Sequence, residues 1–277
     1  MENRNGENIA FLGAGKMARS LATAFFRHGR FKGDQIVGTV RSPDDLEKFK
    51  EVFPFRLLTS NAQAVRESRF IVLSVRPQQL KPLLAEIRDE LTEEKILISV
   101  AAGIPLGKIR DAVRKQIPLL HVHPSSLAFN LSAKGISFLV AADWVDKETI
   151  QKVKAIFESI GEVVETNEEE LNKFAVLAGC APAYLALLVF QLSEIGTELG
   201  LPLSDSLRLE NLVFSGVRDA IVDEGWKPQE ILERIATAEG VTIEGLKVLS
   251  EKGTKEILRL AVEASLSKLQ YLRTILD

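Results

Sequence analysis

Near its start the chain carries Ile9-Ala10-Phe11-Leu12-Gly13-Ala14-Gly15-Lys16-Met17-Ala18, four apolar residues followed at once by a glycine-rich turn. The apolar run predicts a buried strand, and the amphipathic stretch from Ala18 to His28 predicts a helix. This order is typical of a dinucleotide-binding unit. Gly13 allows the turn, Gly15 leaves room for a pyrophosphate, and the first helical turn offers N–H groups to its charge. We therefore expect cofactor contacts from Gly13, Ala14, Gly15, Lys16 and Met17.

The composition is that of a globular protein. The chain has 277 residues, 46% hydrophobic and 26% charged, with a net charge of −3. This length suits one large domain or two modest ones, and the weak charge makes nucleic acid an unexpected partner. We expect no membrane partner, because no apolar run is expected to reach the roughly 20 residues that cross a bilayer, and we find no signal-peptide pattern. The single cysteine, Cys180, favours a cytoplasmic location.

The first part of the chain alternates apolar strands with helices. This pattern predicts a Rossmann-type, doubly wound, mostly parallel sheet with helices on both faces. The expected strands after the first are 36–40, 70–75, 96–100, 119–122, 136–140 and 162–164. The expected helices between them are 44–52, 78–91, 106–113 and 147–160.

After Thr166 the strand pattern stops and only helices are expected, beginning with one that Asn167 caps. The further helices are expected at 182–199, 204–222, 228–235, 242–251 and 255–276. The helix at 182–199 is apolar on nearly every face and needs to be surrounded, most simply by a partner subunit. We therefore expect an NADP-binding domain at 1–165 and an all-helical substrate and dimerisation domain at 166–277, in a homodimer or a higher homo-oligomer.

The end of the second strand favours NADP(H) over NAD(H). An acidic residue at this place holds the ribose 2′-hydroxyl, whereas a basic residue accommodates a 2′-phosphate. Arg41 stands where the acid would be, and Ser42 adds a hydroxyl. A guanidinium and a hydroxyl suit a phosphate. A solvated surface role for Arg41 is the alternative.

Several segments together resemble pyrroline-5-carboxylate reductase, over essentially the whole chain. Residues 70–77 resemble the family's apolar strand ending in Val-Lys-Pro, and residues 99–103 resemble its strand-end segment beside the nicotinamide. Residues 179–184 resemble Gly-Ser-Gly-Pro-Ala-Tyr, and 200–202 and 242–249 match as well. The resemblance implies NADPH-dependent reduction of a small cyclic imino acid, most simply 1-pyrroline-5-carboxylate to proline. It implies cofactor contacts from Asn61, Val75, Arg76, Pro77, Ala101, Ala102 and Gly103.

The resemblance also implies a substrate loop before a helix in the second half. It assigns substrate contacts to Ser125, Thr237, Gly240, Val241 and Thr242. The N–H groups at the start of that helix can bind a carboxylate. The Thr242 hydroxyl, our candidate catalytic group, can hydrogen-bond the imine nitrogen or a carboxylate oxygen. An ordinary helix cap is the alternative for Thr242.

This chain departs from the family near the expected substrate. The family's Arg-Val-Met-Pro-Asn-Thr-Pro is replaced by residues 121–127, with His121, His123 and Ser125. Glu239 places a carboxylate in the substrate loop. The two histidines alternate on one strand face, but no third ligand lies nearby in sequence, so we expect no metal.

Two other functions stay open. One is a related NADP-dependent dehydrogenase of another imine, ketone or hydroxy acid. The other is a non-catalytic dimer that senses nucleotides, because a fold does not fix a function.

Overall fold

One mixed sheet organises the first part of the chain in the computed structural model, which describes residues 7–125 and 135–274. Its strands follow the order β3-β2-β1-β4-β5-β6-β7-β8. The strands are β1 (Ile9–Leu12), β2 (Ile36–Thr39), β3 (Arg56–Leu58), β4 (Phe70–Leu73), β5 (Ile96–Ser99), β6 (Leu119–Pro124), β7 (Gly135–Ala141) and β8 (Gly161–Glu165).

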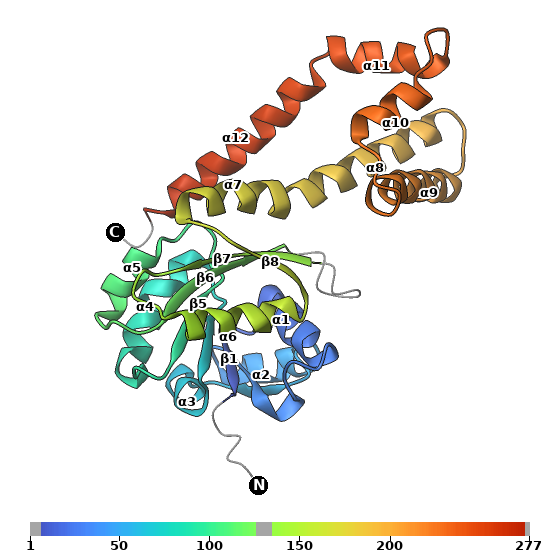
Figure 1. Cartoon of the computed structure of the whole chain (residues 1–277). Coiled ribbons are helices and arrows are strands. Elements are labelled where there is room, and N and C mark those ends of the chain that lie inside the picture. Colours follow the sequence, from blue (N-terminus) through green and yellow to red (C-terminus); the bar gives the residue numbers. More distant parts are fainter. Residues whose placement is uncertain (1–6, 126–134, 275–277) are drawn as a thin grey trace. The chain divides into compact units, whose positions relative to one another are not determined.

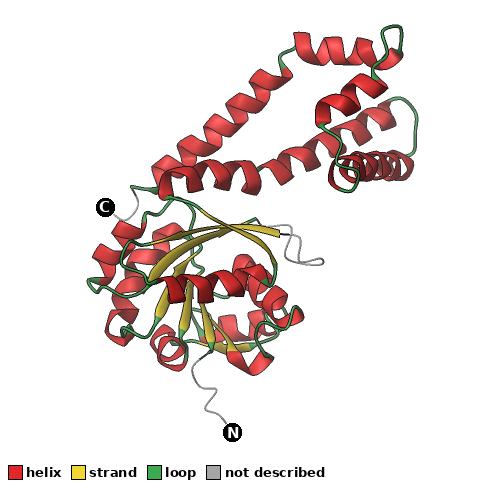
Figure 2. Ribbon diagram, in the orientation of Figure 1, coloured by secondary structure: helices red, strands yellow, loops and turns green. Residues whose placement is uncertain are grey.

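Every neighbouring pair in this sheet is parallel except β6 and β7, which are antiparallel. The chain between Pro124 and Gly135 is shorter than the dozen or more residues that a parallel crossover needs. Figure 2 shows helices on both faces of the sheet. The predicted Rossmann-type, mostly parallel sheet is confirmed.

Helices cover the sheet between its strands. They are α1 (Lys16–Arg27), α2 (Pro43–Lys50), α3 (Asn61–Glu67), α4 (Pro77–Ile87), α5 (Leu106–Val113) and α6 (Lys147–Glu158), with short 3₁₀ turns at Gly33–Gln35 and Arg88–Glu90. The sequence analysis missed β3 and α3. The other strands and helices lie close to their expected positions (Figure 1).

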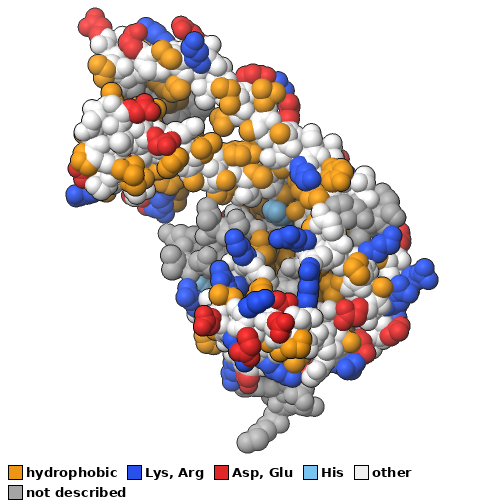
Figure 3. All heavy atoms as spheres, turned by 180° about the vertical axis from the view of Figure 1, so that it is seen from behind, with side chains coloured by type: hydrophobic (Ala, Val, Ile, Leu, Met, Phe, Trp, Pro, Cys, Tyr) orange, Lys and Arg blue, Asp and Glu red, His pale blue; other side chains and the backbone are white. Residues whose placement is uncertain are grey.

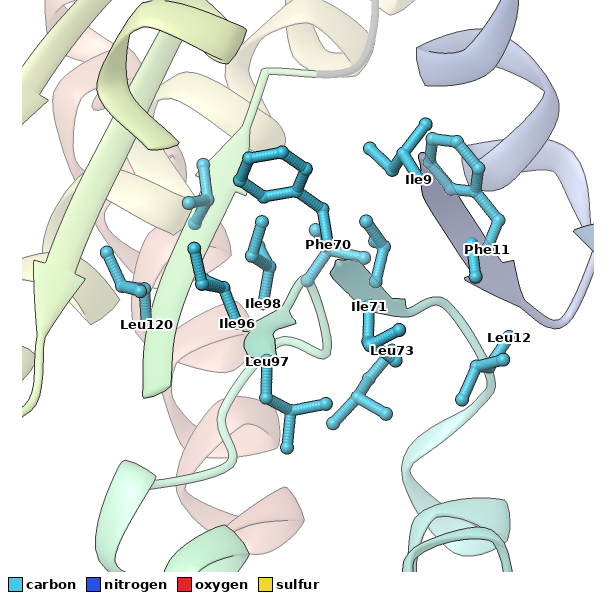
Figure 4. Close-up of a cluster of buried hydrophobic side chains, with 14 of the residues drawn as sticks. Ile9, Phe11, Leu12, Phe70, Ile71, Leu73, Ile96, Leu97, Ile98 and Leu120 are labelled. Atoms are coloured by element: carbon cyan, nitrogen blue, oxygen red, sulfur yellow. The ribbon is translucent and has the colours of Figure 1, made fainter. Parts of the chain in front are cut away.

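The core lies between the central strands and their helices. All residues of β1, β4 and β5 are buried, as their continuous apolar sequences predict. Figure 4 shows side chains from these strands, among them Phe11, Phe70 and Ile98, filling this layer. The ring of Phe25 on α1 meets that of Phe157 on α6 edge to face, with centroids 5.3 Å apart, so these two helices share one face of the sheet.

The helices after the sheet are α7 (Glu168–Gly179), α8 (Ala181–Glu198), α9 (Leu203–Val222), α10 (Pro228–Ile235), α11 (Val241–Glu251) and α12 (Thr254–Leu272). Asn167 caps α7 as expected, because its Oδ1 accepts the N–H groups of Glu169 and Glu170, each at 3.0 Å. The expected all-helical second part is confirmed.

The chain divides into two compact units. Residues 1–179 and 266–277 form one, here called the sheet unit, and residues 180–265 form the other, the helical unit. The sheet therefore ends at Glu165, but α7 and the last turns of α12 make their contacts within the sheet unit. The boundary at 165 and 166 stays a prediction.

Large apolar side chains are exposed over the helical unit, as the orange surface in Figure 3 shows. On α8, for example, Leu187 is 52% exposed and Phe190 is 51% exposed. A helix with so apolar a surface is expected to be covered, and the described residues of the helical unit leave these side chains exposed.

The expectation that no apolar run approaches membrane-spanning length is wrong. No charged residue stands between Lys173 and Glu194. Among the described residues, the helical stretch Glu168–Glu198 is long and apolar enough to cross a membrane, by length and composition alone, because an 18-residue window within it has a mean hydropathy of 1.9. The same apolar surface suits a partner subunit.

Candidate active site

The glycine turn after β1 is built as its sequence predicts. Gly13 has a φ of +96°, and a Cβ on it would stand 2.7 Å from Cγ1 of Val75. The next amide, of Ala14, donates to the Thr39 carbonyl at 2.7 Å, and the Ser74 hydroxyl donates to the Gly13 carbonyl at 2.9 Å. The turn is therefore held from both neighbouring strands, β2 and β4, and Gly13 is required by close approach as well as by φ.

Gly15 is required for a different reason. It is the N-cap of α1 with a φ of −73°, and a Cβ on it would meet nothing within 4 Å. No side chain caps α1, and no acidic residue stands in its first turn. The helix start therefore offers free N–H groups and positive partial charge beside open space, which fits a pyrophosphate. Lys16 and Met17 form the first turn of this helix.

A cavity of about 700 Å³ opens at this turn, within the range of ligand sites. Seven of the expected cofactor residues line it: Gly13, Ala14, Gly15, Arg41, Asn61, Val75 and Arg76. It is also lined by residues that the sequence analysis missed: Thr39, Val40, Asp45, Phe49, Thr59, Ser74, Gln79 and Glu86. The remaining expected cofactor residues, Lys16, Met17, Ser42, Pro77, Ala101, Ala102 and Gly103, are not among those that line it.

Arg41 and Ser42 differ in what holds them. Arg41 is exposed and lines the cavity, so its guanidinium is available to an anion there. The Ser42 hydroxyl instead accepts the N–H of Asp45 at 3.2 Å and caps α2. Asp45 belongs to the first turn of α2. Arg41 is therefore the stronger of the two candidates for a 2′-phosphate.

Polar side chains from three elements are joined behind the glycine turn. The Gly13 amide donates to the Thr39 hydroxyl at 3.0 Å, and this hydroxyl donates to Oδ1 of Asn61 at 2.6 Å. The Asn61 amide donates in turn to Oε2 of Glu86 on α4 at 2.9 Å. Asn61 thus lies at the cavity, as the resemblance implied, and it is bonded at both ends of its amide.

Comparisons with known proteins agree with this architecture. Residues 8–103 match the family model described as "NADP oxidoreductase coenzyme F420-dependent", and residues 168–272 match "Pyrroline-5-carboxylate reductase dimerisation". The chain is 30% identical over 257 residues to a curated pyrroline-5-carboxylate reductase of Glycine max, covering 93% of each chain. The chain belongs to the pyrroline-5-carboxylate reductase family.

Other members of the pyrroline-5-carboxylate reductase family match at similar length. The reductase of Corynebacterium melassecola is 26% identical over 259 residues, covering 92% of this chain and 95% of the relative. A solved reductase of Coxiella burnetii superposes with a TM-score of 0.82 at 26% identity, over 98% of this chain and 100% of the other. The Plasmodium falciparum structure, with NADP bound, has a TM-score of 0.87 at 24% identity and shows the shared fold.

The loop after β5, from which the resemblance implies cofactor contacts, has a packing constraint. Gly103 has a φ of +78°, and a Cβ on it would stand 2.9 Å from the Leu269 carbonyl oxygen of α12. Lys108 donates to the Arg273 carbonyl at 2.6 Å just beyond. Gly103 is therefore explained by its contact with the end of α12, while Ala101 and Ala102 precede it in the same loop.

His121 and His123, which lie on β6, belong to the sheet unit. Burial, with a smaller effect of the nearby His123, lowers the pKa of His121 to about 3, and a hydrogen bond with the Ile104 backbone opposes this. Burial lowers the pKa of His123 to about 4. Neither Nε2 atom has a hydrogen-bond partner among the described residues. Both imidazoles are therefore neutral near pH 7.

His121 lines a small cavity of about 10 Å³, the size of one water molecule. Glu168 and Asn172 of α7 and Arg273 line the same cavity. The Glu168 carboxylate also accepts the Leu106 amide at 2.6 Å. His123 lies against the end of α7, because a Cβ on Gly179 would stand 3.0 Å from its Nε2.

The expected substrate residues belong to different units. Ser125 is buried in the sheet unit, where its hydroxyl donates to the Ala178 carbonyl at 3.1 Å. Its neighbours Ser126 and Leu127 lie outside the described residues. In the helical unit, Gly240 is the N-cap of α11, and a Cβ on it would stand 2.6 Å from Oγ1 of Thr237.

The start of α11 is open, as an anion site requires. Val241 is 90% exposed, Thr242 is exposed in the first helical turn, and no side chain caps the helix. Thr242 is therefore not the cap of this helix. Glu239 is exposed in the turn just before Gly240.

Proposed function

We propose that this protein reduces 1-pyrroline-5-carboxylate to proline with NADPH. The observation that carries the proposal is the match of nearly the whole chain to curated reductases of this name. The glycine turn, the open start of α1 and the cavity beside them supply a fitting dinucleotide site. When bound, NADPH supplies the hydride, and the protein supplies binding, orientation and electrostatics.

The cofactor contacts divide by what each residue offers. The backbone of Gly13, Ala14 and Gly15, with Lys16 and Met17, offers N–H groups to the pyrophosphate. Arg41 offers a guanidinium to the 2′-phosphate, with Ser42 beside it in sequence. The remaining proposed contacts are Asn61, Val75, Arg76, Pro77, Ala101, Ala102 and Gly103.

The substrate carboxylate is proposed to bind at the start of α11. The free N–H groups after Gly240 and the hydroxyl of Thr242 suit an anion. Thr242 then holds a carboxylate oxygen or the imine nitrogen, and no side-chain acid is needed because the imine can arrive protonated. Thr237 and Val241 complete the proposed contacts of the helical unit, and Ser125 stays a separate candidate within the sheet unit.

We further propose a homodimer, formed through the helices that follow Pro182. The dimerisation model of the family covers the exposed apolar helices of the helical unit. A partner subunit would remove this apolar surface from water, which is the main source of free energy in such association. The proposed location is the cytoplasm, without a membrane or nucleic-acid partner.

A turnover assay tests the proposed activity. The purified protein is incubated with NADPH and 1-pyrroline-5-carboxylate, and the absorbance of the reduced cofactor is followed. We expect loss of absorbance only when both are present, with proline as the product. No consumption above background, while an authentic reductase is active in the same assay, removes the proposal.

Glu239 favours one alternative, a dehydrogenase acting on another imine, ketone or hydroxy acid, since a carboxylate beside the loop repels a substrate carboxylate. The same assay with a panel of such substrates distinguishes this alternative from the reduction of 1-pyrroline-5-carboxylate. Turnover of another panel member alone supports the alternative. NADPH binding without turnover of any member supports a nucleotide sensor.

A further inference from the structure

The exposed carboxylate of Glu86 is the end point of the hydrogen-bonded chain behind the glycine turn. From the turn outward this chain runs from the Gly13 amide to Thr39, then to Asn61, and ends at Glu86 on α4. Its members lie in the turn after β1 and on β2, α3 and α4, which are separated in sequence. All four residues line the dinucleotide cavity.

The chemistry of the groups allows one direction for these bonds. An ionised carboxylate only accepts, so the end of the Asn61 side chain that faces Glu86 must be its NH₂ group. The Asn61 oxygen then faces Thr39 and must accept the single proton of the hydroxyl. The hydroxyl oxygen is left to accept the Gly13 amide. Glu86 therefore determines which end of the Asn61 amide faces Thr39, and the resulting bonds agree with the Gly13 amide, which can only donate.

This orientation matters for a ligand. Because its oxygen is used by Thr39 and one N–H by Glu86, the group that Asn61 can still offer to the cavity is its second N–H. A donor suits the oxygens of a phosphate or a ribose hydroxyl, whereas an amide oxygen repels a phosphate. Without Glu86 no carboxylate accepts from the Asn61 NH₂ group, so nothing on this side selects which end of the amide faces Thr39.

We propose that Glu86 is a positioning residue for the dinucleotide: it holds Asn61 as a donor toward the cavity and, through Thr39, fixes the turn at Gly13. Resting on the proposed function, the inference adds a residue that lines the cofactor cavity and acts on the cofactor through another side chain, Asn61. Thr39 is only 2% exposed, so water cannot readily replace its partners.

A second carboxylate provides a matched control. Glu90, in the 3₁₀ turn that directly follows α4, pairs with Arg66 of α3 at 2.5 Å. This pair links the same two regions as Glu86 and Asn61 but is not among the residues that line the cavity. Loss of Glu90 therefore reports on the packing of α3 and α4 alone.

The test is the dissociation constant for NADPH, measured by calorimetric titration of the full-length protein. We expect Glu86→Ala, and Glu86→Leu which retains bulk, to weaken binding about 5- to 30-fold, as for loss of a charged hydrogen bond. Glu86→Gln retains an acceptor and should bind within about 2-fold of the unmodified protein. Glu90→Ala should also bind normally, and its kcat at saturating NADPH should equal that of the unmodified protein.

The double variant Glu86→Ala, Asn61→Ala separates a relay from two independent contacts. If Glu86 acts through Asn61, the dissociation constant of the double variant for NADPH should lie within about 2-fold of that of Asn61→Ala alone. The inference is overturned if the affinity losses of the two single variants multiply in the double variant. It is also overturned if Glu86→Ala binds NADPH normally, or if Glu90→Ala loses as much affinity as Glu86→Ala. If the unmodified protein does not bind NADPH, the proposed function fails as well. If it binds NADPH and only the variants behave otherwise than expected, the inference on Glu86 fails alone.

Discussion

Gly13 and Val75 approach each other too closely for a side chain between them: a Cβ on Gly13 would stand 2.7 Å from Cγ1 of Val75. The φ of +96° at Gly13 adds a second cost for any other residue. The turn of the dinucleotide site is thus packed directly against the end of β4.

Gly13→Ala should lower the free energy of unfolding by about 2–4 kcal/mol, from the strained φ and from overpacking against Val75. Urea unfolding measures this. Gly29→Ala is the matched control, because Gly29 also has a positive φ, +71°, but a Cβ there meets nothing within 4 Å. Equal losses in the two variants would show that the contact with Val75 costs nothing.

Arg41→Asp should weaken NADPH binding about 30-fold or more and NADH binding far less, because it removes a charge-assisted bond to the 2′-phosphate and adds repulsion. The dissociation constants of both nucleotides check this. Arg114→Asp, outside the cavity, makes the same change of net charge. An equal effect of Arg41→Asp on both nucleotides clears Arg41 of the phosphate role.

His121 should make the protein less stable in acid. Its pKa in the folded protein is lowered by burial to about 3, so the unfolded chain takes up the proton first as the pH falls below about 6.5. The contribution of neutral His121 to the free energy of unfolding is fully present above pH 6.5 and is lost as the pH falls toward 3. Between pH 7.5 and 5 this amounts to about 2 kcal/mol.

Urea unfolding at these two pH values measures that loss. His121→Gln should reduce the difference between them, whereas His28→Gln, at an exposed histidine, should leave it unchanged. If His121→Gln loses as much stability on acidification as the unmodified protein, the imidazole is not the group responsible.

Leu188→Glu should dissociate the proposed dimer. Leu188 is a 47% exposed apolar residue of α8, and a carboxylate there would be buried unpaired in an interface. Light scattering should give about twice the chain mass of 30.6 kDa for the unmodified protein and about that mass for the variant. Val52→Glu, at an exposed apolar residue outside the helical unit, should remain dimeric. A monomeric unmodified protein contradicts the proposal.

The sequence predicted the fold well where burial is continuous. The strands β1 and β4 are fully apolar and β5 is apolar up to Ser99, and all three are buried along their whole length, so composition alone identifies them. The strand β3 was missed because this edge strand is three residues long and begins with the exposed Arg56. The helix α3 was missed because it has only seven residues, although Ser60 caps it by accepting the Gln63 amide.

The site was predicted in part for a similar reason. Gly13, Gly15 and Arg41 could be found because local motifs carry their roles. Thr39 and Glu86 could not be found, since their roles arise from hydrogen bonds between residues that are 22 to 26 positions apart in sequence. The length of α8 could be predicted from the sequence. The membrane-like composition could have been predicted as well, because no charged residue stands between Lys173 and Glu194.

The most direct test of this account is a titration of Gly15→Val with NADPH. A Cβ at residue 15 meets no protein atom within 4 Å, so the variant should fold, with a melting temperature close to that of the unmodified protein. Its side chain would fill the space assigned to the pyrophosphate, and we predict an affinity at least about 100-fold lower, equivalent to about 2.8 kcal/mol. NADPH affinity equal to that of the unmodified protein would contradict the dinucleotide site.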